Sequence, residues 1–181
     1  MENVFNLFKD DSRKAFTWES LGDIKFGRGD LGEEMPVIVY RLMQFTLMDA
    51  LSADLGRIKA NDYFRQAGYL AGSEFARNLL NLELDFNSFI SQLQESLKLL
   101  KIGILRMEFF NPDDGTMILT VAEDLDCSGL PITNESVCVY DEGFISGVLE
   151  VYTGQKYDVR ETDCWATGDR VCRFKAAPTV G

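Results

Sequence analysis

The stretch from Glu135 to Phe174 reads ESVCVYDEGFISGVLEVYTGQKYDVRETDCWATGDRVCRF and contains three of the four cysteines, Cys138, Cys164 and Cys172. Residues 157–162 within it alternate between larger apolar and polar side chains, which predicts a strand. Glu161 falls on the apolar face of that strand. A carboxylate on an apolar face is costly to bury unless a cation or a hydrogen-bond donor meets it.

Residues 170–174 predict the return strand of a hairpin, joined to the first strand by a turn in which Gly168 is free to take a positive φ. The hairpin brings Glu161 and Cys164 close to Cys172, and Cys138 arrives from a separate element. Three thiolates and one carboxylate suit tetrahedral zinc at roughly 2.0–2.3 Å from its ligands. We therefore predict a metal site of Cys138, Glu161, Cys164 and Cys172. Four protein ligands leave no open position, so the zinc would be structural.

Other interpretations of the cysteines stay open. Buried cysteines are often only small hydrophobic residues, and four cysteines can also form two disulfides. The fourth cysteine, Cys127, is predicted not to bind the metal, but it is the natural substitute if Glu161 does not coordinate.

The stretch resembles the vinyl reductase-type domain, which also forms the ligand-sensing part of bacterial activators that respond to phenol and xylene. The resembling features are the Val137-Cys138 step, the Gly143-Phe144-x-x-Gly147 helix and the pattern Glu161-x-x-Cys164-x7-Cys172-x-Phe174. The likeness is strongest here and looser from Gly22 onward. In the sensor members, a cysteine, a glutamate and two further cysteines in this order hold zinc, so the resemblance implies the same ligand set.

The resemblance also implies a fold and a manner of assembly. Its members share a fold with small subunits of the Golgi transport-particle complex and commonly dimerise through helices, so we expect a homodimer. The phenol sensors anchor the phenolic hydroxyl with a histidine and a tryptophan. This chain has no histidine, which argues against phenol itself as the ligand.

Length and composition limit the class of protein. The chain has 181 residues, 46% of them hydrophobic, as expected of one globular domain, which we place at residues 16–177 behind an N-terminal arm at residues 1–15. No apolar run reaches the ~20 residues of a membrane span, and no signal peptide is evident, so a cytoplasmic location is expected. The net charge of −11 argues against nucleic-acid binding, and the lack of histidine excludes histidine-based catalysis.

Patterning along the chain predicts an α+β fold, an antiparallel sheet with helices packed on one side. Residues 16–26 alternate weakly and predict one or two short strands. Four helices are predicted at residues 36–55, 61–80, 85–100 and 141–153, the last capped by Asp141, and a further hairpin at residues 102–110 and 116–122. The first helix is apolar all round, so it either crosses the core or meets a partner subunit.

The second helix carries Gly68-x-x-x-Gly72. Each glycine inside a helix costs about 1 kcal/mol relative to alanine, so these positions need a reason. Two reasons remain open. The glycines allow close packing against another helix, which we favour, or they leave room for a ligand beside the small face.

Three functional hypotheses follow. The first is a sensor module that binds a small apolar, aromatic or tetrapyrrole-like ligand and passes the signal to an unidentified partner; its predicted lining is Leu42, Phe45, Phe64, Gly68, Phe75 and Trp165. The second is an accessory protein in tetrapyrrole vinyl reduction, since independent catalysis is disfavoured by the absence of a dinucleotide fingerprint. The third is a dimeric protein-interaction scaffold.

Overall fold

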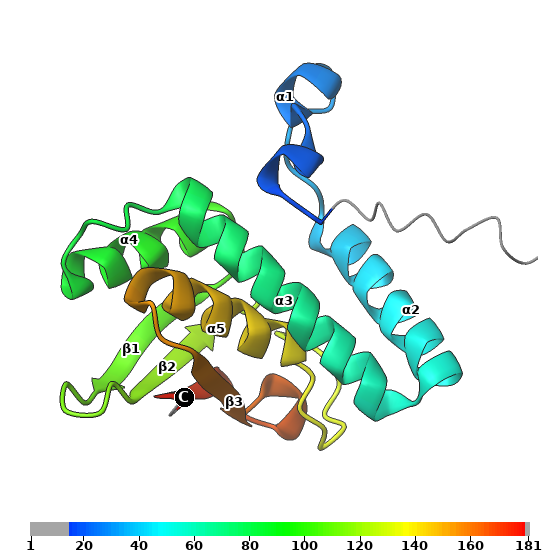
Figure 1. Cartoon of the computed structure of the whole chain (residues 1–181). Helices are drawn as coiled ribbons and strands as arrows, with labels where there is room; N and C mark the ends of the chain where they lie inside the picture. Colours follow the sequence, from blue (N-terminus) through cyan, green and yellow to red (C-terminus); the bar gives the residue numbers. More distant parts are fainter. Residues whose placement is uncertain (1–14, 180–181) are drawn as a thin grey trace, which may run out of the picture.

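A computed structural model describes residues 15–179 of the chain. The predicted arm at residues 1–15 therefore lies almost entirely outside the described residues. The larger elements, in chain order, are α2 (Val37–Leu55), α3 (Arg57–Leu79), α4 (Phe86–Leu99), β1 (Ile104–Phe110), β2 (Met117–Ala122), α5 (Val139–Thr153), β3 (Tyr157–Asp163) and β4 (Cys172–Pro178) (Figure 1). The α+β prediction is confirmed.

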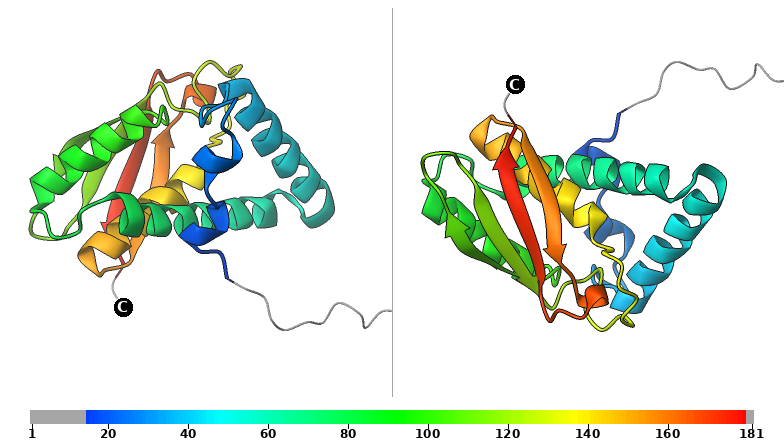
Figure 2. Two further views of the ribbon diagram at one scale, coloured as in Figure 1. Left: turned by 90° about the horizontal axis from the view of Figure 1, so that it is seen from above. Right: turned by 90° about the horizontal axis from the view of Figure 1, so that it is seen from below.

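The four strands form one antiparallel sheet in the order β1-β2-β4-β3. The two predicted hairpins are both present and meet in the middle, where Val121 of β2 pairs with Cys172 of β4. Helices α3, α4 and α5 lie on one face, and the opposite face carries no helix (Figure 2). That open face presents charged side chains such as Arg106, Glu108 and Lys175, as expected of a half-solvated antiparallel sheet.

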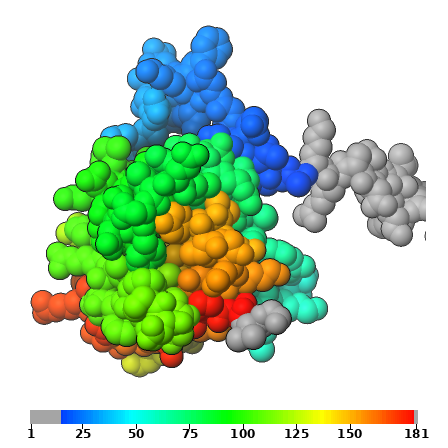
Figure 3. Space-filling view, turned by 60° about the vertical axis from the view of Figure 1, so that its left-hand side comes forward, coloured from blue at the N-terminus to red at the C-terminus, as the bar shows by residue number. Residues whose placement is uncertain are grey.

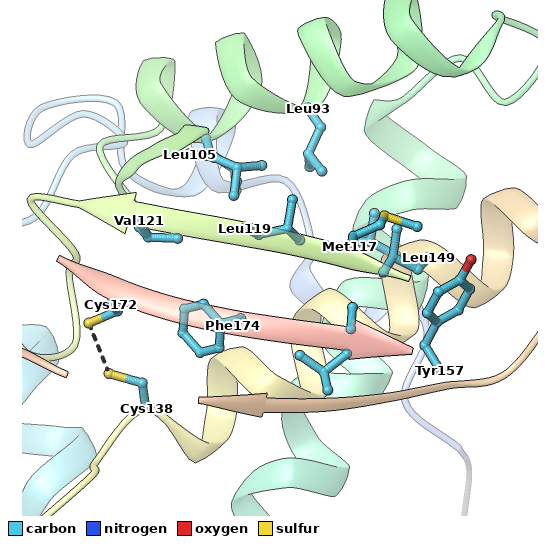
Figure 4. Close-up of a cluster of buried hydrophobic side chains, with 14 of the residues drawn as sticks. Leu93, Leu105, Met117, Leu119, Val121, Cys138, Leu149, Tyr157, Cys172 and Phe174 are labelled. Carbon is cyan, nitrogen blue, oxygen red and sulfur yellow. Dashed lines mark hydrogen bonds between the residues drawn. The ribbon is translucent and has the colours of Figure 1, made fainter. Parts of the chain in front are cut away.

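The core lies between this sheet and helices α4 and α5. Phe89, Leu149, Met117, Leu119 and Phe174 are each at most 1% exposed. Figure 4 shows Leu93 of α4 above the strands, with Cys138 and Cys172 at one end of the buried layer and Leu149 and Tyr157 at the other. One end of the core is therefore rich in cysteine sulfur, and the other consists of larger aliphatic and aromatic side chains, with Met117 among them (Figure 4).

Helices α3 and α5 cross in close contact through their glycines. A Cβ atom on Gly68 would lie 2.0 Å from the Tyr140 carbonyl oxygen, and one on Gly143 would lie 1.9 Å from the Arg65 carbonyl oxygen. Gly72 and Gly147 are equally close to opposing backbone. Close helix packing therefore accounts for the Gly68-x-x-x-Gly72 spacing, and no ligand space lies beside that small face.

Helix α2 does not cross the core. Only Gln44 and Met48 of its side chains are buried, and it meets α3 at the turn that joins the two helices and diverges from it toward its own N-terminus (Figure 1). Six of its apolar residues are between 46% and 64% exposed: Val37, Ile38, Val39, Leu42, Met43 and Leu47. Of the two explanations of its all-round apolar sequence, the passage through the core is wrong, and the partner surface stays a prediction.

The segment before α2 differs from the prediction of short strands. It forms a 3-10 helix, η1 (Trp18–Leu21), and one helical turn, α1 (Ile24–Gly27), which project from the main body (Figure 3). Asp23 caps α1 by accepting a hydrogen bond from the Phe26 N–H. A weak alternation over so few residues cannot outweigh a local cap, and no neighbouring strand is available to pair with this segment.

Other boundaries moved by a few residues. Helix α5 begins at Val139 with Cys138 as its N-cap residue, so the prediction that Asp141 caps it is wrong. Asp141 lies instead in the first turn, where a carboxylate is favoured by the helix dipole. Gly154 ends α5 in a left-handed conformation. Gly168 has φ 106°, a positive value as predicted. No helix of residues 15–179 is long and apolar enough to cross a membrane.

Candidate functional site

All four cysteines converge at the sulfur-rich end of the core. Their Sγ atoms lie within 4.8 Å of one another, and every one of these residues is at most 1% exposed. The Sγ of Cys172 lies 3.0 Å from that of Cys127 and 3.7 Å from that of Cys138, which is 3.9 Å from Cys164 (Figure 4). All four thiols are free, so the cluster contains no disulfide.

Four separate pieces of chain supply these thiols. Cys127 follows β2, Cys138 precedes the first turn of α5, Cys164 follows β3, and Cys172 begins β4. The pairing of β2 with β4 brings Cys127 beside Cys172, because Val121 and Cys172 are register partners and the chain turns back after β2. The cluster thus joins the ends of three elements and the loop after β2.

Glu161 lies beside this cluster and not among its four sulfur atoms. Its side chain is on the apolar face of β3, as predicted, and its Oε2 accepts a hydrogen bond of 3.3 Å from the Cys138 N–H. Its Oε1 is buried and has no hydrogen-bond partner among residues 15–179. Burial, together with the nearby Cys164 thiolate, raises the pKa of Glu161 to about 8. Through this hydrogen bond to Cys138, Glu161 therefore helps to hold the N-terminus of α5 in place.

The donor set fits a zinc ion. Tetrahedral zinc with sulfur ligands at about 2.3 Å separates those sulfur atoms by roughly 3.7–3.8 Å. The Cys138 separations to Cys172 and Cys164 match this value, and the Cys127–Cys172 pair is closer. Hydrogen bonds from the other three thiols lower the pKa of Cys164, so one member of the cluster is readily a thiolate, the form that binds metal.

Three carboxylates lie next to the cysteines. Asp124 and Asp141 each place an oxygen within 4.8 Å of the Cys138 Sγ, and Asp126 lies beside them. Burial raises the pKa of Asp141 well above its usual range, and burial together with Asp124 raises the pKa of Asp126 to about 6. The site therefore gathers three buried carboxyl groups, whose ionised forms are disfavoured by burial and by one another.

The loop at residues 124–128 is held by hydrogen bonds from within and from α2. Asp124 Oδ1 accepts from the backbone N–H groups of Asp126 and Cys127. The Tyr40 hydroxyl donates to Asp126 Oδ1 at 2.8 Å, and Gln44 Nε2 donates to Oδ2 at 2.7 Å. Arg41 donates to three carbonyl oxygens of the loop, those of Asp124, Leu125 and Ser128. Helix α2, the loop and the cysteine cluster are therefore mechanically connected.

A cavity of about 170 Å³ lies next to this loop, between α4, α5 and the sheet. Its walls are mostly aliphatic, with Phe144 as the one phenylalanine; they include Ile90, Leu93, Leu97, Leu105, Leu119, Ile145 and Val148. Its polar residues are two tyrosines and the three aspartates: Tyr40, Tyr140, Asp124, Asp126 and Asp141. A mostly apolar cavity with a few convergent polar groups is the usual form of a small-molecule site.

None of the six residues predicted to line a pocket lines this cavity. Gly68 packs on the backbone of α5, and Phe75 packs edge-on against Phe144 with ring centroids 5.2 Å apart. Trp165 donates its indole N–H to the Leu130 carbonyl oxygen. The other three, Leu42, Phe45 and Phe64, belong to α2 or to the part of α3 that faces it.

A second hollow lies between α2 and α3. It is an apolar groove that includes Met43, Leu47, Leu51 and Phe64, and it shares Tyr40 and Tyr140 with the cavity. Phe45 and Phe64 line a further hollow near Glu135 and Val137. The two tyrosines thus lie between the α2–α3 groove and the internal cavity.

Sequence reasoning missed the aspartates and the cavity. The sequence offered one hint, the short distance from these aspartates to the cysteines. Asp124 and Asp126 lie three residues and one residue before Cys127, and Asp141 comes three residues after Cys138. Acidic residues this close to candidate metal ligands are drawn into the same buried region. The lining from α4, however, requires the packing of α4 on the sheet, which no spacing in the sequence reveals.

Comparison with known proteins shows similarity to one domain family and to two archaeal proteins. Residues 117–178, from β2 to the end of β4, match the model of the V4R domain. An uncharacterized protein of Methanocaldococcus jannaschii is 27% identical over 147 residues, which cover 81% of this chain and 80% of that protein. A second uncharacterized protein of that organism is 29% identical over 106 residues, 59% of this chain and 60% of its own length.

Solved structures share the fold at low sequence identity. The phenol-responsive sensory domain of the transcription activator PoxR, bound to phenol, superposes with a TM-score of 0.61 at 13% identity and covers 81% of this chain and 76% of its own. A vinyl-4-reductase family protein from M. jannaschii gives 0.58 at 15% identity, with 83% and 85% covered.

Two further solved structures, of other kinds of protein, share the fold. A trafficking protein particle complex subunit 3 from Naegleria fowleri, covalently bound to palmitic acid, gives a TM-score of 0.58 at 13% identity, with 80% of this chain and 98% of that chain covered. An H-NOX protein from S. oneidensis gives 0.51 at 13% identity, with 76% and 74% covered. The predicted likeness to sensor and Golgi-transport folds is confirmed, and residues 117–178 are similar to the V4R domain.

Proposed function

We propose that this protein is a ligand-binding sensor module that holds a small apolar molecule in the cavity between α4, α5 and the sheet. The cavity itself carries the proposal. An apolar protein cavity of about 150 Å³ accommodates benzene, and this one measures about 170 Å³. Its capacity therefore suits one aromatic ring or an aliphatic body of similar size.

The comparisons support this proposal. The PoxR sensory domain is a phenol-bound member of the same fold, and the trafficking subunit of that fold holds palmitic acid. Both show that the fold accepts ligands with an apolar body. This chain has no histidine, which argues against phenol, and the polar residues that line the cavity are aspartates and tyrosines.

The second part of the proposal is a structural zinc ion held by Cys127, Cys138, Cys164 and Cys172. The convergence of four buried thiols supports this ligand set over the set that includes Glu161. We assign Glu161 instead the role of accepting the hydrogen bond from the Cys138 N–H. When bound, zinc would cross-link the loop after β2, the start of α5 and the terminal hairpin. Such a link contributes to folding free energy and performs no chemistry on the ligand. Reduced cysteines fit a reducing cytoplasm.

The exposed apolar face of α2 supports a homodimer. A monomeric protein rarely exposes a large continuous apolar patch, and partners usually cover one. A dimer formed through α2 would connect the partner to the loop at residues 124–128 through Tyr40, Arg41 and Gln44. Through that connection, a ligand in the cavity could affect the subunit interface. The same exposed face of α2 would also serve a dimeric interaction scaffold.

The proposal is tested by measuring ligand binding before and after a larger side chain is placed in the cavity. We expect benzyl alcohol to bind the purified protein in isothermal titration calorimetry, and the variant Leu93→Phe to weaken that binding at least ~10-fold because the ring occupies ligand space. The matched control is Leu99→Phe, also on α4, whose leucine is 81% exposed. Absence of binding to the unaltered protein by this probe and by benzylamine, or equal binding by the Leu93→Phe variant, would overturn the cavity as the ligand site.

A further inference from the structure

We propose that the ligand of the cavity carries a compact cationic amine on a body the size of one aromatic ring, with the amine at the Asp141 end. The inference rests on the proposed ligand-binding function and names the chemical class of the ligand. It depends on three observations: an acceptor without a donor, the absence of a cation in the cavity wall, and the negative centre behind that wall.

The first observation is the free oxygen of Asp141. Oδ2 of this residue is buried and accepts no hydrogen bond from residues 15–179, although the residue lines the cavity. Its position in the first turn of α5 favours a negative charge but does not supply a donor to this oxygen. Buried polar atoms are nearly always paired, so this oxygen is available to a hydrogen-bond donor on a ligand in the cavity.

The second observation is that the hydrogen-bond donors near Asp141 already bind other acceptors. Asp126 is already paired with Tyr40 and Gln44, and Asp124 Oδ1 with two backbone N–H groups. The nearest cation, Arg41, directs its guanidinium to backbone carbonyl oxygens. No lysine or arginine lines the cavity within the described part of the chain. The polar end therefore contains three carboxylates and no protein cation.

The third observation is the cysteine cluster behind this wall. The Cys138 Sγ lies within 4.8 Å of carboxylate oxygens of Asp124 and Asp141. Four thiolates outweigh the charge of one zinc ion, so a metal-loaded cluster adds negative charge to that of the aspartates. A ligand carboxylate or phosphate would be repelled from this end, a hydroxyl would supply one donor without charge, and an ammonium group supplies both donors and charge.

The shape of the cavity sets the rest of the ligand. Away from the aspartates, the wall consists of aliphatic side chains from α4, α5 and the two central strands, with the Phe144 ring among them. A polar group attached there would lose its hydration without compensation. The ligand therefore has one polar end and one apolar end, as in an arylalkylamine.

The experiment compares three molecules of similar size on the zinc-loaded full chain by isothermal titration calorimetry at neutral pH. They are benzylamine, which is cationic, benzyl alcohol, which is neutral, and benzoate, which is anionic. We expect benzylamine to bind at least ~10-fold more tightly than benzyl alcohol, since charge-assisted hydrogen bonds are roughly twice as strong as neutral ones. Benzoate should not bind measurably.

The variant Asp141→Asn should abolish that preference. Benzylamine affinity should fall ~10-fold or more, whereas benzyl alcohol affinity should change less than ~3-fold. Asp158→Asn, at an exposed position of β3, is the matched control and should leave both affinities unchanged. Native mass spectrometry of each variant verifies that the metal content is equal, and thermal unfolding verifies the fold.

The outcomes separate the two proposals. If benzyl alcohol binds as tightly as benzylamine, or if Asp141→Asn leaves the preference intact, the cationic ligand is overturned and the cavity remains a ligand site. A second metal ion that binds at Asp141 and blocks benzylamine would overturn it too. If none of the three molecules binds, the ligand-binding function itself fails.

Discussion

At the scale of single residues, the cluster of four cysteines is the most specific arrangement in the molecule. Zinc binding is strongest with deprotonated thiolates in a closed tetrahedral set, and Cys127 completes that set in space. Glu161 has a different contact, to the Cys138 N–H. The two residues therefore make separable predictions about metal retention.

We expect Cys127→Ser to lose zinc and to lower the unfolding temperature, because a hydroxyl is a much poorer zinc ligand than a thiolate. Glu161→Gln should retain zinc, since an amide oxygen still accepts the Cys138 N–H, with a stability change of about 1 kcal/mol or less. Metal content by native mass spectrometry and melting by calorimetry test both. Glu108→Gln, on the open face of the sheet, is the control for the glutamate change. Zinc loss in Glu161→Gln with retention in Cys127→Ser would restore Glu161 as the ligand.

How well the sequence predicts the site depends on how far apart in the chain the contacting residues lie. The order Glu161-x-x-Cys164-x7-Cys172 lies within one hairpin, so local patterning correctly places these residues together. Cys127 joins them only because β2 and β4 are neighbours, a pairing between strands fifty residues apart that no local periodicity encodes. The chain between β2 and α5 has no periodic pattern, so the sequence places Cys127 in a loop and predicts it as a ligand only if Glu161 does not coordinate.

At the scale of elements, the crossing of α3 and α5 depends on four glycines. Gly147→Ala would place a Cβ atom 2.3 Å from the Tyr69 carbonyl oxygen, so the two helices would have to separate. We expect a cost of about 3 kcal/mol or more, which corresponds to roughly 6–12 °C in unfolding temperature.

The control for this change is Gly27→Ala at the end of α1, where an added Cβ atom meets nothing within 4 Å. This substitution should alter stability by no more than about 1 kcal/mol and in the stabilising direction, because alanine has the higher helix propensity. An equal loss in the two variants, measured by thermal unfolding, would show that close packing is not what the α5 glycine provides.

The helices illustrate what patterning decides and what it leaves open. Helix α4, with apolar residues at helical spacing behind the Asp85 cap, matches its predicted position to within a residue at each end. For α2 the pattern was equally clear, but apolar residues all round do not state which side faces the protein. The answer depends on polar contacts of Tyr40, Arg41 and Gln44 with a distant loop.

Those contacts predict how α2 is attached. Arg41→Ala removes three hydrogen bonds to the 124–128 loop and should loosen α2 by about 2–3 kcal/mol. Hydrogen exchange should then accelerate in α2 and in this loop, with α3 and α5 unchanged. Arg106→Ala, at an exposed position of β1, is the control. Unchanged exchange in α2 would contradict the attachment through Arg41.

At the scale of the whole molecule, two features stand in contrast. The body formed by α3, α4, α5 and the sheet buries its apolar residues, whereas α2 and the segment before it leave theirs exposed: Phe26 is 88% exposed, Leu31 79%, Ile38 64% and Met43 62%. Figure 3 shows the segment before α2 projecting from that body. Monomeric proteins rarely expose a continuous apolar surface of this kind, so we expect a second copy to cover it.

The dimer prediction is tested by placing charges on the α2 face. The double variant Met43→Glu/Leu47→Glu should sediment as a monomer where the unaltered protein sediments as a dimer, because burying two unpaired carboxylates in an apolar interface costs several kcal/mol. Leu99→Glu, at an 81% exposed position of α4, should remain dimeric. Both variants should keep the zinc and the fold, since the substituted side chains lie outside the core. A monomeric unaltered protein at micromolar concentration would assign the α2 face to a different partner, and a dimeric double variant would place the interface elsewhere on the molecule.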